Sequence, residues 1–142
     1  MTAPSVQSLL PHVAPVSGDV RLVLYAIRRM ADGGMGDAHA AHVFLTAFGL
    51  HYRRPLVLAR ALVSEMSRVA TRRVLIAPCC CPRMSAGEAV LVDALCASAS
   101  AGSATHQQLA QLLGVRSCGG VLASVQAITA CFQDLGRPLH GA

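Results

Sequence analysis

The sequence predicts a single all-α domain of five or six helices, and three observations support this prediction. Apolar residues recur at three- and four-residue spacing in several segments, which is the period of an amphipathic helix. Capping residues and glycines separate these segments. The one strand-like run, Val74 to Ala77, has no convincing second strand to pair with, so we expect extended loop there. A chain of 142 residues that is 54% hydrophobic can bury a core of its own.

The first helix is expected over residues 20–31, after a flexible tail. Residues 1–18 contain three prolines and end in a glycine, so we place the folded domain at 19–142. Asp19 is a plausible N-cap for the helix. Its apolar positions follow helical spacing, and its opposite face is polar and carries Arg21, Arg28 and Arg29.

Two further helices follow in the first half of the chain. Asp37 can cap a helix over 38–48, which Gly49 ends. Pro55 suits the first position of a third helix that runs to about Thr71. Three arginines, Arg60, Arg68 and Arg72, belong to the polar stripe of this third helix.

The sequence of the second half of the chain predicts three more helices. Ser85 and Glu88 form a capping-box pattern at the start of a helix over 86–97. A short helix ends at Leu113, before Gly114, and the last runs from about 120 to 135. A cysteine-rich loop therefore lies between the third and fourth helices.

This loop reads A-P-C-C-C-P-R-M, from Ala77 to Met84, with three consecutive cysteines between two prolines. Proline biases the residue before it toward extended conformations, so we expect the triplet to be extended. Side chains alternate in an extended chain, and Cys79 and Cys81 would then face one side while Cys80 faces the other.

The first functional hypothesis is a non-catalytic protein that holds zinc or iron in this loop. His39 and His42 lie three apart on a predicted helix and share a face. Together with Cys79 and Cys81 they would form a Cys2His2 set, which suits a tetrahedral metal. A solvated histidine pair is the competing interpretation, because both side chains point away from the apolar face of that helix.

The second hypothesis is thiol redox chemistry by the same loop. Cys79, Cys80 and Cys81 would supply a pair that cycles between dithiol and disulfide, and Arg83 would lower the pKa of one thiol. Cys96 and Cys131 lie on apolar helical faces and are expected in the core.

The third hypothesis is an adaptor that docks an acidic partner protein. The net charge of +5 falls entirely within residues 1–73, where nine arginines face four acidic residues. We expect Arg60, Arg68 and Arg72 to carry such an interface, with the first predicted helix contributing further arginines. No nucleic-acid-binding motif is present, so nucleic acid is not the expected partner.

Other functional classes find little support in the sequence. It contains no G-x-S-x-G, P-loop or H-E-x-x-H motif, so we do not expect an enzyme. No apolar run approaches the roughly 20 residues of a membrane helix, and the N-terminus lacks the pattern of a signal peptide. We therefore expect a cytoplasmic protein whose cysteines are reduced, metal-bound or buried and are not paired in structural disulfides.

Four motifs carry a family resemblance: D-A-H-A-A-H at 37–42, Y-R-R-P-L-V-L at 52–58, the cysteine loop at 77–84 and D-L-G-R-P-L at 134–139. Over roughly residues 19–139 the chain resembles a family of small, uncharacterised bacterial proteins known as a domain of unknown function. The resemblance implies a bacterial source and brings no activity or ligand with it.

Overall fold

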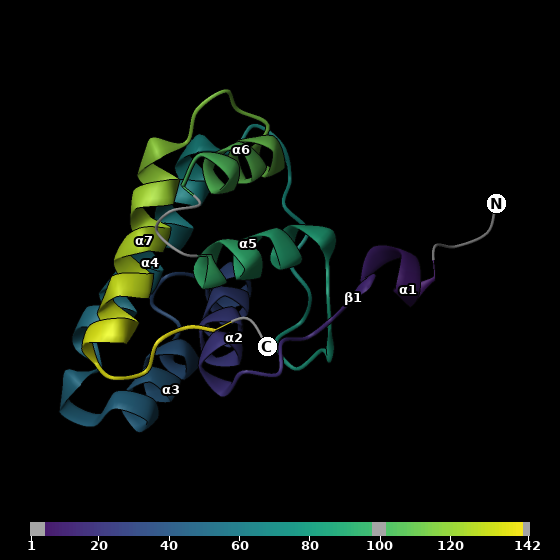
Figure 1. The fold of residues 1–142 in the computed structure, drawn as a ribbon. Helices are drawn as coiled ribbons and strands as arrows, with labels where there is room; N and C mark the ends of the chain where they lie inside the picture. Colours follow the sequence, from purple (N-terminus) through teal and green to yellow (C-terminus); the bar gives the residue numbers. More distant parts are fainter. Residues whose placement is uncertain (1–4, 98–101, 141–142) are drawn as a thin grey trace.

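The computed structural model describes residues 5–97 and 102–140 and confirms the all-α single domain (Figure 1). Among these residues, six helices of 11 to 17 residues form the body. They are α2 (Gly18–Gly33), α3 (Ala38–Phe48), α4 (Arg53–Val69), α5 (Ala86–Cys96), α6 (Gly102–Leu113) and α7 (Gly119–Asp134). A short 3-10 helix, η1 (Gly49–His51), connects α3 to α4. The cysteine loop lies between α4 and α5, as the sequence predicts.

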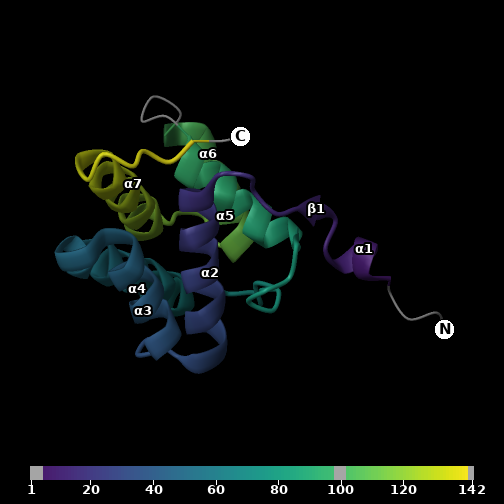
Figure 2. The same cartoon turned by 90° about the horizontal axis from the view of Figure 1, so that it is seen from below.

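The core lies along α4, which packs against both α7 and α2, and α3, α5 and α6 pack around these three helices (Figures 1 and 2). Its largest fully buried side chains include two phenylalanines, Phe44 of α3 and Phe132 of α7. Phe48 contacts both of them, with its ring edge against Phe132 at a centroid distance of 5.1 Å. Aromatic contacts of this kind add to the hydrophobic burial that stabilises the domain.

The start of α2 differs from the prediction. The helix begins at Gly18 with Ser17 in the N-cap position, so Asp19 is not the cap. Asp19 instead accepts a hydrogen bond from Arg137, whose guanidinium also lies over the Phe48 ring and donates to the Ala47 carbonyl. The Asp19 carboxylate, which the local sequence pattern assigns to a helix cap, therefore binds Arg137, 118 positions away.

The N-terminal segment contains two short elements, α1 (Val6–Leu9) and β1 (His12–Val13). The strand β1 pairs in antiparallel fashion with β2 (Arg83–Met84), which forms the end of the cysteine loop. Ala14 adds a hydrogen bond from its N–H to the Pro82 carbonyl. The expected flexibility of residues 1–18 stays a prediction, but this contact places the end of the segment beside the cysteines. Figure 2 shows α1 beyond the helical body.

None of the helices in residues 5–97 and 102–140 combines the length and the apolar character needed to cross a membrane.

Candidate functional site

A buried ion pair holds the cysteine loop against α2. The Arg28 Nε lies 2.6 Å from a Glu88 carboxylate oxygen, and the side chains are 3% and 0% exposed. The remaining Arg28 nitrogens donate to the main-chain carbonyls of Cys81 and Arg83, each at 2.8 Å. One guanidinium thus joins α2, the end of the loop and the first turn of α5, which fixes where the loop lies. Arg28, which helical spacing places on the polar face of the first predicted helix, is therefore buried.

Glu88 occupies the third position of α5 and completes the predicted capping box. Its carboxylate accepts from the Ser85 N–H, while the Ser85 hydroxyl oxygen accepts from the Glu88 N–H. The Ser85 hydroxyl also donates to the Leu75 carbonyl. The cap and the ion pair share one carboxylate, so the start of α5 and both ends of the cysteine loop form one hydrogen-bonded unit.

The cysteine triplet forms a turn and is not extended, which corrects the alternation argument. The Cys81 N–H donates to the Pro78 carbonyl at 3.0 Å and closes the turn over Cys79 and Cys80. The Cys79 and Cys80 sulfurs consequently lie 3.5 Å apart, close enough to share a hydrogen bond. Proline fixes its own φ and leaves the residues after it free to turn, so the close thiol pair is the adjacent one.

A cation lies beside this pair, and it comes from α2. The Arg29 Nη1 lies 3.9 Å from the Cys79 sulfur. Asp37, which caps α3 by accepting from the Ala40 N–H, accepts two hydrogen bonds from Arg29 and orients its guanidinium. The pKa of Asp37 is lowered by Arg29 first and by the Ala40 N–H second, so the carboxylate stays ionised at neutral pH. Asp37 in turn raises the pKa of Arg29, which keeps the cation in place.

The two thiols differ in acidity. The pKa of Cys79 lies below its ordinary value because Cys80 hydrogen-bonds to its sulfur and Arg29 faces it. The pKa of Cys80 is raised, chiefly by the same hydrogen bond to Cys79. Cys79 is therefore the more acidic thiol of the pair. Burial raises the pKa of each of the helical or core thiols, Cys96, Cys118 and Cys131.

The residues of the metal hypothesis do not meet in this arrangement. His39 and His42 are exposed on α3, while Cys79 and Cys81 are half-buried in the loop. Within residues 5–97 and 102–140, no three His, Cys, Asp or Glu side chains gather as a metal site. Zinc or iron binding through these four residues stays a prediction.

Arg83 lies in the loop, but its partners are in the N-terminal segment. Its guanidinium donates to the main-chain carbonyls of Leu10 and Pro11. Arg29 is therefore the cation beside the thiol, and Arg83 fastens the N-terminal segment to β2. The sequence alone did not indicate Arg29 for this role. Its position depends on the hydrogen bonds to Asp37, which the glycine-rich turn between α2 and α3 brings close to it.

The arginines expected to dock an acidic partner do not form one stripe. Arg68 pairs with Glu65 three residues earlier on α4, and Arg60 is half-buried. The helix ends at Val69, so Arg72 lies beyond it and lines a neighbouring cavity instead. Arg28 and Arg29 are occupied by Glu88 and Asp37, which leaves less free positive charge than the sequence indicates. Docking of an acidic partner through Arg60, Arg68 and Arg72 stays a prediction.

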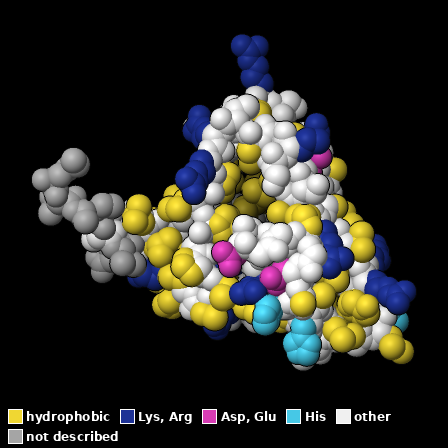
Figure 3. All heavy atoms as spheres, turned by 180° about the vertical axis from the view of Figure 1, so that it is seen from behind, with side chains coloured by type: hydrophobic (Ala, Val, Ile, Leu, Met, Phe, Trp, Pro, Cys, Tyr) yellow, Lys and Arg dark blue, Asp and Glu magenta, His cyan; other side chains and the backbone are white. Residues whose placement is uncertain are grey.

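Two adjoining cavities lie beside residues 74–76, and the second of them reaches Cys79. Figure 3 shows a hollow with apolar side chains on the rear face of the molecule. The first, about 410 Å³, is an apolar hollow between the C-terminal ends of α2 and α4. The second, about 500 Å³, lies between α2 and residues 73–79 and includes Cys79 in its wall. Both have Ala31, Val74 and Ile76 in their walls, so the two cavities adjoin, and we call them together the groove. A separate cavity of about 370 Å³ touches all three cysteines from the side of Ala14 and Tyr25.

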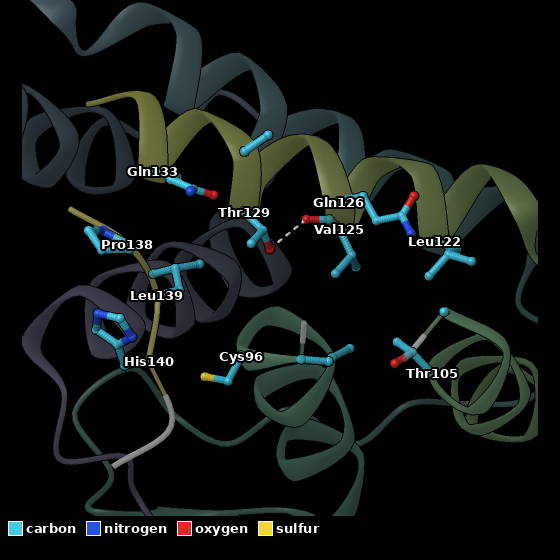
Figure 4. Close-up of a pocket in the computed structure, with 14 residues that line it drawn as sticks. Cys96, Thr105, Leu122, Val125, Gln126, Thr129, Gln133, Pro138, Leu139 and His140 are labelled. Atoms are coloured by element: carbon cyan, nitrogen blue, oxygen red, sulfur yellow. Dashed lines mark hydrogen bonds between the residues drawn. The ribbon is translucent and has the colours of Figure 1, made fainter. Parts of the chain in front are cut away.

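A further cavity, about 470 Å³, lies between α5, α6, α7 and the C-terminal segment (Figure 4). Figure 4 shows Thr105, Leu122 and Val125 around its apolar part, with Cys96 facing the side on which His140 lies. The Thr129 hydroxyl already hydrogen-bonds to the carbonyls of Leu95 and Val125. Cys79, Cys80 and Cys81 do not line this cavity.

Comparison with known proteins gives one match. A family model described as "Family of unknown function (DUF6628)" matches residues 5–135, which include all the elements of the site. This confirms the resemblance to an uncharacterised domain family, while the bacterial source stays a prediction. No curated protein and no solved structure matches the chain significantly.

Proposed function

We propose thiol–disulfide exchange at Cys79 as the function of this chain, which belongs to the DUF6628 family of unknown function. One observation carries the proposal: the Cys79 sulfur lies 3.5 Å from the Cys80 sulfur and 3.9 Å from the Arg29 guanidinium. A nucleophilic thiol needs a nearby donor or cation that favours the thiolate, and Cys79 has both.

The exchange step uses the chain's own residues for the nucleophile and its activation. The Cys79 thiolate attacks one sulfur of a substrate disulfide, the substrate S–S bond breaks, and a mixed disulfide with Cys79 forms. The displaced thiolate takes a proton from solvent. A thiolate from a thiol in solution then attacks the substrate sulfur of the mixed disulfide, forms a new disulfide with it and releases Cys79 as thiolate, so the thiol is the reductant for Cys79.

Cys80 acts in this scheme as a hydrogen-bond donor. Adjacent residues joined by a trans peptide have Cα atoms about 3.8 Å apart, which is shorter than the usual disulfide span of about 4.4–6.8 Å. A Cys79–Cys80 disulfide would therefore be strained and easily reduced. Its raised pKa keeps Cys80 protonated and able to donate to the Cys79 thiolate.

The test is reaction with a small disulfide, 4,4′-dithiodipyridine, at substoichiometric ratio and neutral pH. We expect mass spectrometry of peptides to find the first label on Cys79. Cys96, Cys118 and Cys131 should stay unmodified, because burial raises their pKa values. Cys79→Ser should abolish this fast phase, and Cys81→Ser, the matched control, should keep it. Equal labelling of all three loop cysteines would contradict the proposal.

A further inference from the structure

The segment from Arg73 to Ala77, which leads to the thiols, has an unpaired backbone edge. The sequence predicts an extended run here. The segment belongs to no helix or sheet in the structure, and its N–H groups donate to no acceptor within residues 5–97 and 102–140. The Leu75 carbonyl accepts from Ser85 of the α5 cap. In extended chain successive residues turn their N–H and C=O groups to opposite sides, so those of Val74 and Ile76 point away from that cap.

The groove beside this edge is apolar and adaptable. Val74 and Ile76 line it together with Met30, Met35 and Met66. Methionine is flexible and polarisable, and surfaces rich in it accommodate apolar side chains of varied shape. Side chains of an extended ligand that pairs with residues 73–77 would therefore find an apolar surface on one side.

The positive charge beside the groove indicates a negatively charged ligand. Arg72 lines the apolar hollow, Arg73 lines the cavity that reaches Cys79, and both side chains are exposed. Neither forms an ion pair with an acidic group in the described part of the chain. Asp32 lies in the wall of the Cys79 cavity, so acidic groups are favoured away from the reacting sulfur.

We infer that the substrate of Cys79 is a disulfide-bonded cysteine within an extended, apolar and acidic peptide segment, which adds a strand along residues 73–77. Main-chain hydrogen bonds would give affinity, and the groove would select alternate apolar side chains. Residues 73 to 79 span about 20 Å when extended, so about six residues of the ligand contact the chain. The inference rests on the proposed thiol function and specifies its substrate class.

The probe is a nonapeptide, acetyl-Glu-Val-Ser-Val-Cys-Val-Ser-Val-Glu-amide, whose cysteine carries 2-nitro-5-thiobenzoate in a mixed disulfide. The sequence is symmetric about the cysteine, so it can pair in either direction. We expect it to release the coloured thiol at least ten times faster, per molar, than the same mixed disulfide of N-acetylcysteine amide. A tenfold advantage corresponds to about 1.4 kcal/mol of binding free energy. A peptide with N-methylated valines, which cannot donate to the edge, should lose this advantage.

A matched pair of protein variants tests the location. Ala31 is exposed on α2 and lines both cavities, and Ala31→Trp should lower the rate ratio of peptide to N-acetylcysteine toward one. Ala123 is an exposed alanine on α7, outside these cavities, and Ala123→Trp should leave the ratio unchanged. An unchanged ratio in Ala31→Trp would overturn the inference.

The two proposals fail in different ways. If Cys79 reacts with the N-acetylcysteine disulfide but the peptide has no advantage, the thiol function stands and the peptide groove is wrong. If Cys79 reacts with neither, the thiol function is wrong. The groove is then tested in Cys79→Ser protein with a peptide that carries serine in place of cysteine, where we expect slower amide hydrogen exchange at residues 73–77. Unchanged exchange there overturns the inference independently of thiol chemistry.

Discussion

Removing Arg28 should destabilise the protein far more than removing a surface arginine. Arg28 and Glu88 are 3% and 0% exposed, so Arg28→Met leaves a fully buried carboxylate without its cation. Breaking a buried pair in this way costs about 3–5 kcal/mol. The carbonyls of Cys81 and Arg83 also lose their donor, but these contacts are only partly buried and water can replace it.

Urea denaturation measures this loss as a shift of the midpoint. With an m-value of about 2 kcal/mol/M, a loss of about 3–5 kcal/mol moves the midpoint down by about 1.5–2.5 M. The matched control is Arg54→Met, because Arg54 and Asp134 form a pair with side chains 59% and 61% exposed. An exposed pair of this kind contributes about 0–1 kcal/mol, so its midpoint should shift by at most about 0.5 M.

The double variant Arg28→Met/Glu88→Met separates the buried charge from the other contacts. It leaves no unpaired charge and should recover most of the loss in the single variant, apart from the Ser85 N–H that Glu88 accepts. A midpoint for Arg28→Met within 0.5 M of the wild type, as in the control, would refute the reasoning that this pair anchors the loop.

Three further predictions concern the site. Arg29→Gln should raise the pKa of Cys79 and slow its reaction with 4,4′-dithiodipyridine at pH 7. The control is Arg116→Gln, which changes an exposed arginine outside the site and should leave the rate unchanged. Equal rates in the two variants would exclude Arg29 as the activating cation. The pKa of Asp37 is lowered in the folded state, so its contribution to stability is present above the unfolded pKa of about 3.9 and is lost as the pH falls through the folded pKa. Asp37→Asn should therefore flatten the acid limb of a plot of the free energy of unfolding against pH, and an unchanged limb would contradict this assignment. Elemental analysis of protein purified without added metal should find substoichiometric zinc and iron, while stoichiometric metal that disappears in Cys79→Ser and Cys81→Ser would restore the metal hypothesis.

Features set by neighbouring residues were predictable from the sequence. The Asp37 cap, the capping box of Ser85 and Glu88 and the start of α3 at Ala38 depend on contacts within three or four positions, and the structure confirms them. Local capping chemistry and helical periodicity are enough to locate such elements. The same is true of the position of the cysteine loop between two helices.

Features set by distant partners were not predictable. The periodicity of α2 places Arg28 on a polar face, and only Glu88, 60 residues later, makes its burial tolerable. Asp19 has the sequence of a cap but pairs with Arg137, which the fold alone brings near. In the loop, the prolines restrict the chain without deciding between extended and turned conformations, so the pairing of Cys79 with Cys80 appears only in three dimensions.

The pH dependence of alkylation at Cys79 tests the thiol account most directly. Wild-type protein is treated with limiting iodoacetamide across pH 5–10, and mass spectrometry follows the modification rate of each cysteine separately. The account predicts a midpoint for Cys79 below the ordinary thiol value of about 8.5, and below the midpoint of Cys80 in the same samples. A Cys79 midpoint at or above that ordinary value, or one that coincides with the midpoint of Cys80, would contradict it.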